Sequence, residues 1–337
     1  MEIARALILA GRRGGDTPPW PAAPTGPRHL FPVANEPIIS HNLRALRDAG
    51  VLEAAILAGD DERAAIERAI GDGRDWGLSV RYGDWAVADG LHGALTAEEA
   101  FVGDEPVLVQ RGDALLRDRL QRHIASFSRE GIDALGLRLR PVAARRGRAV
   151  TSAPATAPGY LFSARAVAML LERPETADGP LAFVEAGGGR VRVEEVHGVL
   201  PCDGDQDALL DSNRAVLEGL AGTTLPVSVE DCVVQGPVAV HPTAQVRGGT
   251  LRGPLVIGPG AVVRDSYVGP YSSIGADTVI EGTEIEHSIV LPRAELRFVG
   301  TRIESSVIGR GARIVRSFRP PGSMRMSLGD GAEVVIS

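Results

Sequence analysis

Short apolar segments alternate with amphipathic segments from residue 4 to about residue 222. The apolar runs predict strands over residues 4–10, 54–58, 78–82, 106–110, 133–139, 159–162 and 191–196. The intervening segments predict helices over residues 40–50, 61–70, 91–101, 117–129 and 207–220, with Ser40 as the cap of the first. This alternation is typical of a mainly parallel sheet with helices on both faces. We therefore expect ligands at the carboxyl ends of the strands.

A different pattern begins near residue 223, where aliphatic residues recur at intervals of 17. The first column comprises Val240, Ile257, Ile274, Leu291 and Ile308. The second comprises Val234, Leu251, Val268 and Ile285, and the third comprises Val246, Val263, Ile280 and Ile314, with a break at Arg297. Such columns predict a solenoid of short strands that buries its apolar residues by stacking coil upon coil. We expect one domain over residues 1–222 and a second over residues 223–337.

Composition narrows the classes of protein that fit. The 337 residues carry a formal net charge of −7, which argues against nucleic-acid binding. No apolar run is long enough for a membrane span, and the first residues do not resemble a signal peptide, so we expect a cytoplasmic protein. The two cysteines exclude a disulfide scaffold. All 36 basic residues are arginine, so no side chain supplies an ammonium group.

Several motifs resemble those of sugar-1-phosphate nucleotidyltransferases, in particular the long form of glucose-1-phosphate thymidylyltransferase. They are Ala6–Gly11 (ALILAG), Phe31–Ile38 (FPVANEPI), Gly112-Asp113 and Leu209–Arg214 (LLDSNR). The resemblance implies a Rossmann-like (GT-A-like) α/β domain with a mixed, mainly parallel sheet. It also implies a C-terminal left-handed parallel β-helix of hexapeptide repeats. The family's reaction joins a nucleoside triphosphate to a sugar-1-phosphate with Mg²⁺ and releases pyrophosphate.

The phosphate-binding loop departs from the family pattern of Gly-Gly-x-Gly-Thr-Arg. This chain has Gly11, Arg12, Arg13, Gly14 and Gly15, followed by Asp16 at the position of the arginine that holds phosphate. The resemblance implies that these residues approach phosphate, with the arginines compensating for the aspartate, although an ordinary turn without a ligand fits equally well. Arg28 takes the place of the family's lysine and keeps its charge with a wider head.

The base-recognition segment is also altered. The resemblance places Trp85 where the family has a glutamine that contacts the base, whereas Gly90 matches the family glycine. The indole of Trp85 fits stacking on a base or sugar, and it equally fits packing beneath a loop.

The family's metal site is matched in part. Asp113 aligns with the first magnesium-binding aspartate. The position of the second holds Cys202, with Asp203 beside it, and a thiol is a poor ligand for Mg²⁺. Asp203 would therefore complete the site only with a shift of register, and an Asp113 without a metal would cap the following helix.

Three functions remain open at this stage. The substitutions favour a homologue with impaired or repurposed catalysis that still binds a nucleotide, sugar phosphate or sugar nucleotide. The alternative is an active Mg²⁺-dependent enzyme with a rewired site, using Arg28 and Asp113. An acyltransferase is a third interpretation, although His241 and His287 lack a recognisable context. The solenoid predicts a homo-oligomer or a complex with an active homologue.

Overall fold

The computed structural model describes residues 3–11, 27–140, 157–173, 178–199, 206–225 and 229–316. Their contacts divide them into two compact units. The first unit holds the described residues up to 199, except residues 31–37. The second holds residues 31–37 together with the described residues from 206 onward. The domain boundary expected at residues 222 and 223 marks where the repeat begins, and it stays a prediction.

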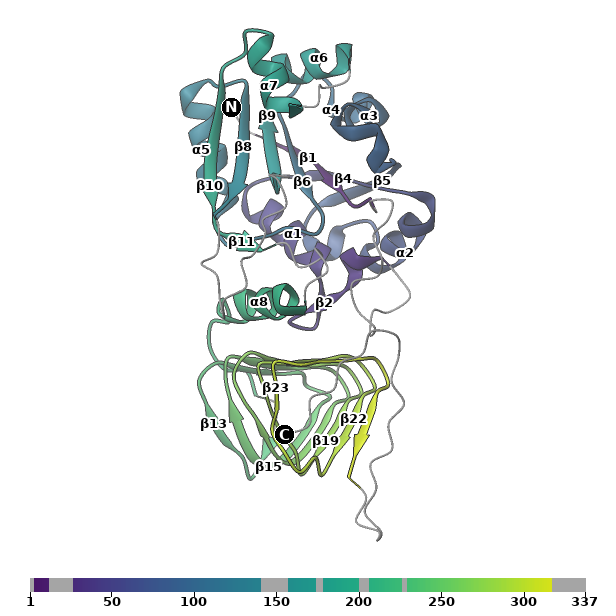
Figure 1. Ribbon diagram of the computed structural model, residues 1–337, viewed down its shortest axis with the longest axis vertical. Helices are drawn as coiled ribbons and strands as arrows, with labels where there is room; N and C mark the ends of the chain where they lie inside the picture. The colour runs from purple at the N-terminus through teal and green to yellow at the C-terminus, as the bar shows by residue number, and fades with distance from the viewer. Residues whose placement is uncertain are drawn as a thin grey trace. The chain divides into compact units, whose positions relative to one another are not determined.

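The first unit is built on a sheet of order β10-β8-β9-β6-β1-β4-β5 (Figure 1). Its strands are β1 (Arg5–Leu9), β4 (Glu53–Ala58), β5 (Ser79–Asp84), β6 (Val107–Arg111), β8 (Ala134–Leu139), β9 (Gly159–Phe162) and β10 (Val191–Val196). Strand β9 is antiparallel to both of its neighbours, and every other pair is parallel. A small antiparallel pair, β7 (Leu115–Leu116) and β11 (Gly198–Val199), lies outside this sheet. The expected mixed, mainly parallel sheet is confirmed.

Successive residues of each central strand face opposite sides, so each side of the sheet carries its own core. Ala6 and Ile8 of β1 belong to the core that receives α1 (Ile38–Asp48), α2 (Asp60–Ile70) and α5 (Leu120–Glu130). Leu7 belongs to the core on the other side. That core receives α3 (Gly90–Ala97), α4 (Glu99–Val102), α6 (Ala164–Glu172) and α7 (Gly179–Ala186). Three short 3₁₀ helices complete the described unit: η1 (Arg28–Leu30), η2 (Arg74–Trp76) and η3 (Val87–Asp89). None of the helices in the described segments is both long and apolar enough to cross a membrane.

Two helices differ from their predicted form. Helix α1 begins at Ile38, so Ser40 is a buried residue inside the helix and is not its cap. The helix expected over residues 91–101 is divided into α3 and α4 at Glu98, whose backbone leaves the helical region. The expected strands over residues 159–162 and 191–196 coincide with β9 and β10.

The second unit contains a β-helix whose paired strands all run parallel (Figure 1). Its strands are β12 (Val229–Glu230), β13 (Val233–Gln235), β14 (Val238–Val240), β15 (Gln245–Arg252), β16 (Leu255–Ile257), β17 (Val262–Val268), β18 (Ser272–Ile274), β19 (Val279–Glu281), β20 (Glu284–Glu286), β21 (Ile289–Val290), β22 (Glu295–Arg297), β23 (Ile303–Glu304), β24 (Val307–Ile308) and β25 (Arg313–Val315). The expected left-handed parallel β-helix is confirmed. Its inward aliphatic residues form one continuous core.

The period of 17 residues changes at two successive coils, so one column position and the expected break differ from the prediction, although Leu291 is itself buried. Ile274 pairs with Val290, so Val290 occupies the place expected for Leu291. Ile280 pairs with Leu296, which fills the third column and removes the break expected at Arg297. The shortening lies after Ile285, which still pairs with Val268 at the regular interval. The next coil is one residue longer than 17, which returns Ile308 and Ile314 to their predicted places. The physical reason is that pairing follows stacking of buried side chains, whereas turns tolerate a changed length.

Helix α8 (Gln206–Leu217) and the hairpin of β2 (Pro32–Val33) and β3 (Glu36–Pro37) also belong to the second unit. Asn213 is buried on α8 and joins them to the β-helix. Its Oδ1 accepts hydrogen bonds from the Ala34 amide at 2.8 Å and the Ser273 hydroxyl at 2.5 Å, and its Nδ2 donates to the Tyr271 carbonyl at 2.9 Å. The LLDSNR motif therefore has a structural role.

Candidate functional site

The carboxyl ends of four parallel strands bring the predicted site residues of the first unit to one edge of the sheet. The Ala10 amide, just after β1, donates to the Leu57 carbonyl of β4 at 2.7 Å. The Gly112 amide, just after β6, donates to the Leu9 carbonyl of β1 at 2.8 Å. Gly11, Trp85 and Asp113 each follow one of these strands. These residues therefore lie at the carboxyl ends of the strands, as expected for an α/β sheet.

Gly11 lies directly against Trp85. A Cβ atom added to Gly11 would approach the Trp85 ring to 2.8 Å and a methyl group of Val87 to 2.6 Å, both closer than carbon atoms normally come. The Trp85 side chain is buried, and its indole N–H donates to the Gly90 carbonyl at 2.9 Å. Gly90 itself has a φ of 62°, which favours glycine. The structure thus joins Gly11 to Trp85 through packing and Trp85 to Gly90 through a hydrogen bond, and a contact of Trp85 with a base stays a prediction.

Asp113 is held by arginine. Its side chain is 2% exposed, and Arg111 donates from Nε to Oδ1 and from Nη2 to Oδ2, both at 2.8 Å. Nη2 of Arg28 lies 3.6 Å from Oδ2. Burial alone would raise the pKa of Asp113, but the hydrogen bonds and charge of Arg111, helped by His29 and Arg28, hold that pKa well below its usual range. Asp113 is therefore an ionised, paired carboxylate.

Arg28 links this carboxylate to the glycine loop. It opens the short helix η1, and its Nη2 also donates to the Gly11 carbonyl at 3.3 Å. The next residue, His29, is fully buried, and neither ring nitrogen has a hydrogen-bond partner within the described segments. Burial lowers the pKa of His29 to about 4, with Asp113 opposing and Arg28 and Arg111 reinforcing the shift. The imidazole is therefore neutral near pH 7.

A buried polar network holds the turn that carries Asp113. Asn42 of α1 donates from Nδ2 to the Gly112 carbonyl at 2.9 Å. Gln110 of β6 donates from Nε2 to Oδ1 of Asn42 at 3.0 Å. These contacts fix the backbone between Arg111 and Asp113, so the geometry of the ion pair is set by the end of β6 and not by a mobile side chain alone.

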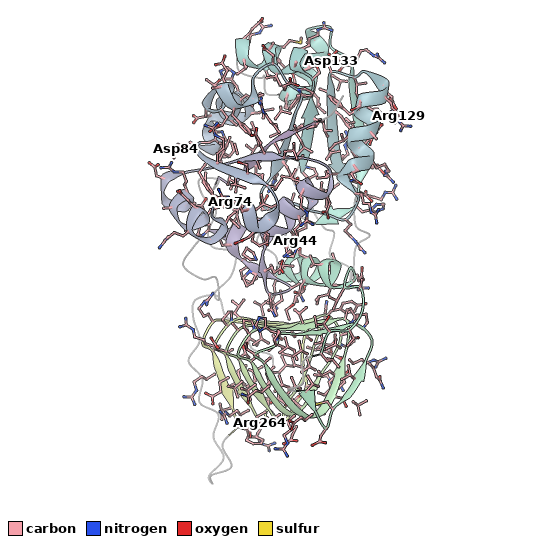
Figure 2. All side chains as sticks on the ribbon, turned by 180° about the vertical axis from the view of Figure 1, so that it is seen from behind. Arg44, Arg74, Asp84, Arg129, Asp133 and Arg264 are labelled. Atoms are coloured by element: carbon pink, nitrogen blue, oxygen red, sulfur yellow. The ribbon has the colours of Figure 1, made fainter. Side chains whose placement is uncertain are left out.

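The setting of Arg111 differs from that of the surface arginines. Arg74, Arg129 and Arg264 are exposed, and Arg129 lies at the outer edge of the first unit (Figure 2). The Arg111 side chain is 14% exposed and that of Arg28 is 17% exposed. Sequence reasoning missed Arg111, Asn42, Gln110 and His29, although the spacing of Arg111 and Asp113 by two residues at a strand end was an available signal.

The described residues do not fit a divalent cation. Mg²⁺ prefers several oxygen ligands in octahedral geometry, and both Asp113 oxygens already accept from a guanidinium. Across the described ranges, no group of three or more histidine, cysteine, aspartate or glutamate side chains could hold a metal ion. Four predicted site residues, Arg12, Arg13, Gly14 and Asp203, lie outside the described residues.

A mixed sheet covered by helices, a parallel β-helix, and arginines and an aspartate at the strand ends define a two-unit α/β protein. Residues 5–185 match the family model described as nucleotidyl transferase. The chain belongs to the sugar-1-phosphate nucleotidyltransferase family.

Relatives match along almost the whole chain. A glucose-1-phosphate thymidylyltransferase of Streptomyces griseus is 31% identical, over 99% of this chain and 99% of its own length. One from Streptomyces antibioticus is 29% identical over 98% of this chain and 99% of its own length. The low-salt glycan biosynthesis nucleotidyltransferase Agl11 of Haloferax volcanii is 28% identical over 98% of this chain and 100% of its own length.

A solved structure shares the fold. A Bacillus anthracis protein assigned as a glucose-1-phosphate thymidylyltransferase superposes with a TM-score of 0.51 at 20% identity. The match covers 65% of this chain and 97% of that one. At this level of identity the likeness bears on the fold alone.

Proposed function

We propose that this chain binds a nucleotide, sugar phosphate or sugar nucleotide at the strand ends of the first unit and has impaired or repurposed catalysis. The observation that supports the proposal is the bidentate pairing of Arg111 with Asp113, with Arg28 beside it. The aspartate that the family uses for magnesium is here already neutralised by arginine.

The chemistry of the family explains why this matters. Transfer of a nucleotidyl group requires positioning of phosphates and stabilisation of charge that develops in the transition state, and a divalent cation supplies much of both. Loss of one such preorganised group typically costs about 10²–10³ in rate. Arginines at the strand ends still favour an anionic ligand, so we expect binding to be retained where turnover is reduced.

The test measures turnover and binding separately. Purified protein is mixed with Mg²⁺, each nucleoside triphosphate and several sugar-1-phosphates, and pyrophosphate release is followed beside the Streptomyces griseus relative as a positive control. Calorimetry then measures binding of each compound. We expect binding with pyrophosphate release at least ~10² below that of the relative. Turnover comparable to the relative's rejects the proposal, and absence of both binding and turnover favours a scaffold.

An active enzyme is the second candidate, and the near-complete match to thymidylyltransferases favours it. In that case Asp113 and Asp203 would hold Mg²⁺, and Arg12, Arg13 and Arg28 would contact phosphate, with thymidine triphosphate and glucose-1-phosphate as the first substrates to test. Arg111 would then have to release Asp113 when the ligands bind.

We also propose that the β-helix supports assembly. The expected partners are further copies of this chain or an active homologue, and the expected location is the cytoplasm. Sedimentation of the purified chain, alone and mixed with an active homologue, tests the assembly.

A further inference from the structure

Two guanidinium groups lie beside the Asp113 carboxylate. Arg111 donates to both of its oxygens at 2.8 Å, and Nη2 of Arg28 lies 3.6 Å from Oδ2. A site prepared for a divalent cation would instead turn its carboxylate oxygens toward that cation.

The placement of Arg111 is built into the fold. Its amide donates to the Pro158 carbonyl at 3.0 Å, and the next residue is held by Leu9 and Asn42. Gly112 has little room for a side chain, since an added Cβ would lie 3.1 Å from Ile8 and 3.2 Å from His29. The turn thus brings the guanidinium of Arg111 and the carboxylate of Asp113 face to face, in a pairing that uses both carboxylate oxygens.

We propose that the guanidinium of Arg111 takes the place of the divalent cation at Asp113, so that this site binds phosphate groups without a divalent cation. The ligand class is a phosphate or phosphoanhydride group, which the guanidinium groups of Arg111 and Arg28 attract. This inference rests on the proposed function for the identity of the ligand, but its exclusion of metal is a separate property of the apoprotein.

The first test measures Mn²⁺ binding to the full chain by electron paramagnetic resonance at pH 7, without any phosphate compound. Arg111→Gln removes one positive charge from beside Asp113, and Arg28→Gln/Arg111→Gln removes two. We expect no binding by the wild type at millimolar Mn²⁺, and affinity at least 10-fold tighter in each successive variant. Adding Asp113→Asn to the double variant should abolish the gain.

The matched control is Arg74→Gln, which removes an equal charge from an exposed arginine. Among the described contacts of its side chain, Arg74 pairs only with the nearby Asp72. It should bind Mn²⁺ no better than the wild type. Micromolar Mn²⁺ binding by the wild type, or no gain in either arginine variant, overturns the inference.

The second test uses the wild type alone, so it does not depend on whether a variant folds. Calorimetry measures binding of inorganic pyrophosphate and of thymidine triphosphate in EDTA and in excess Mg²⁺. We expect each Kd in EDTA to lie within about 3-fold of that in Mg²⁺. A Kd at least 10-fold weaker in EDTA overturns the inference. Rapid turnover rejects the proposed function instead, and the Mn²⁺ series still decides this inference.

Discussion

Arg111 and Asp113 stand two residues apart at the end of β6, and the guanidinium of the first engages both carboxylate oxygens of the second at 2.8 Å. Because the aspartate is almost fully buried, its charge depends on this partner. The pair therefore stabilises the folded state only as long as both members are present.

The first prediction concerns removal of one partner. Arg111→Met should lower the free energy of unfolding by about 3 kcal/mol, since it leaves a buried carboxylate with only the more distant Arg28. Arg111→Met/Asp113→Asn should lower it by less than the sum of the single changes, because the uncompensated charge is gone. Urea denaturation measures Arg111→Met, Asp113→Asn and the double variant. Strict additivity would show that the two side chains do not interact.

The sequence predicts much of the fold and the place of Asp113, but it does not predict every element or the partner of Asp113. The strand predicted over residues 159–162 coincides with β9, since turn residues bound a compact apolar run there. Helix α7 (GPLAFVEA) was missed, since it is apolar nearly all round and lacks helical periodicity. The alignment of Asp113 with a metal ligand predicted its place at the strand end. The partner of the Asp113 carboxylate depends on how the backbone turns at Gly112. No rule of residue spacing tells whether a guanidinium or a metal ion lies beside that carboxylate.

The second prediction concerns the contact between Gly11 and Trp85. Gly11→Ala should lower the free energy of unfolding by about 1–3 kcal/mol, because the new methyl group would overlap the Trp85 ring and Val87. Gly59→Ala is the matched control, since it also follows a central strand and has no atom within 4 Å of an added Cβ. Circular dichroism during urea denaturation measures both. Equal stability of the two variants would contradict the packing described at Gly11.

The third prediction tests the shifted repeat. Leu296 is fully buried in the β-helix core, whereas Arg297 pairs outside it with Glu281 and Glu295. Leu296→Ala should cost about 2–5 kcal/mol, and Arg297→Ala about 0–1 kcal/mol. Thermal unfolding of the two variants compares the positions directly.

A larger loss at Arg297 than at Leu296 would restore the strict period of 17 and contradict the observed pairing. The sequence pattern identified the repeat correctly but not this slip. A coil shortened by one residue is followed by a coil lengthened by one, and only the strand pairing records the two changes.

The last prediction concerns pH and His29. Its folded pKa is about 4, against an ordinary value of 6.5, because the buried imidazole resists protonation. Between these two values the unfolded chain binds more protons, so stability is fully present above pH 6.5 and is lost as the pH falls toward 4.

A pKa difference of this size corresponds to about 3 kcal/mol. His29→Leu should therefore lose about 3 kcal/mol less than the wild type between pH 7 and pH 4. Urea denaturation across that range measures the difference, with the exposed His241→Gln variant expected to follow the wild type. An unchanged slope in His29→Leu would show that this imidazole is protonated as readily in the folded chain as in the unfolded one.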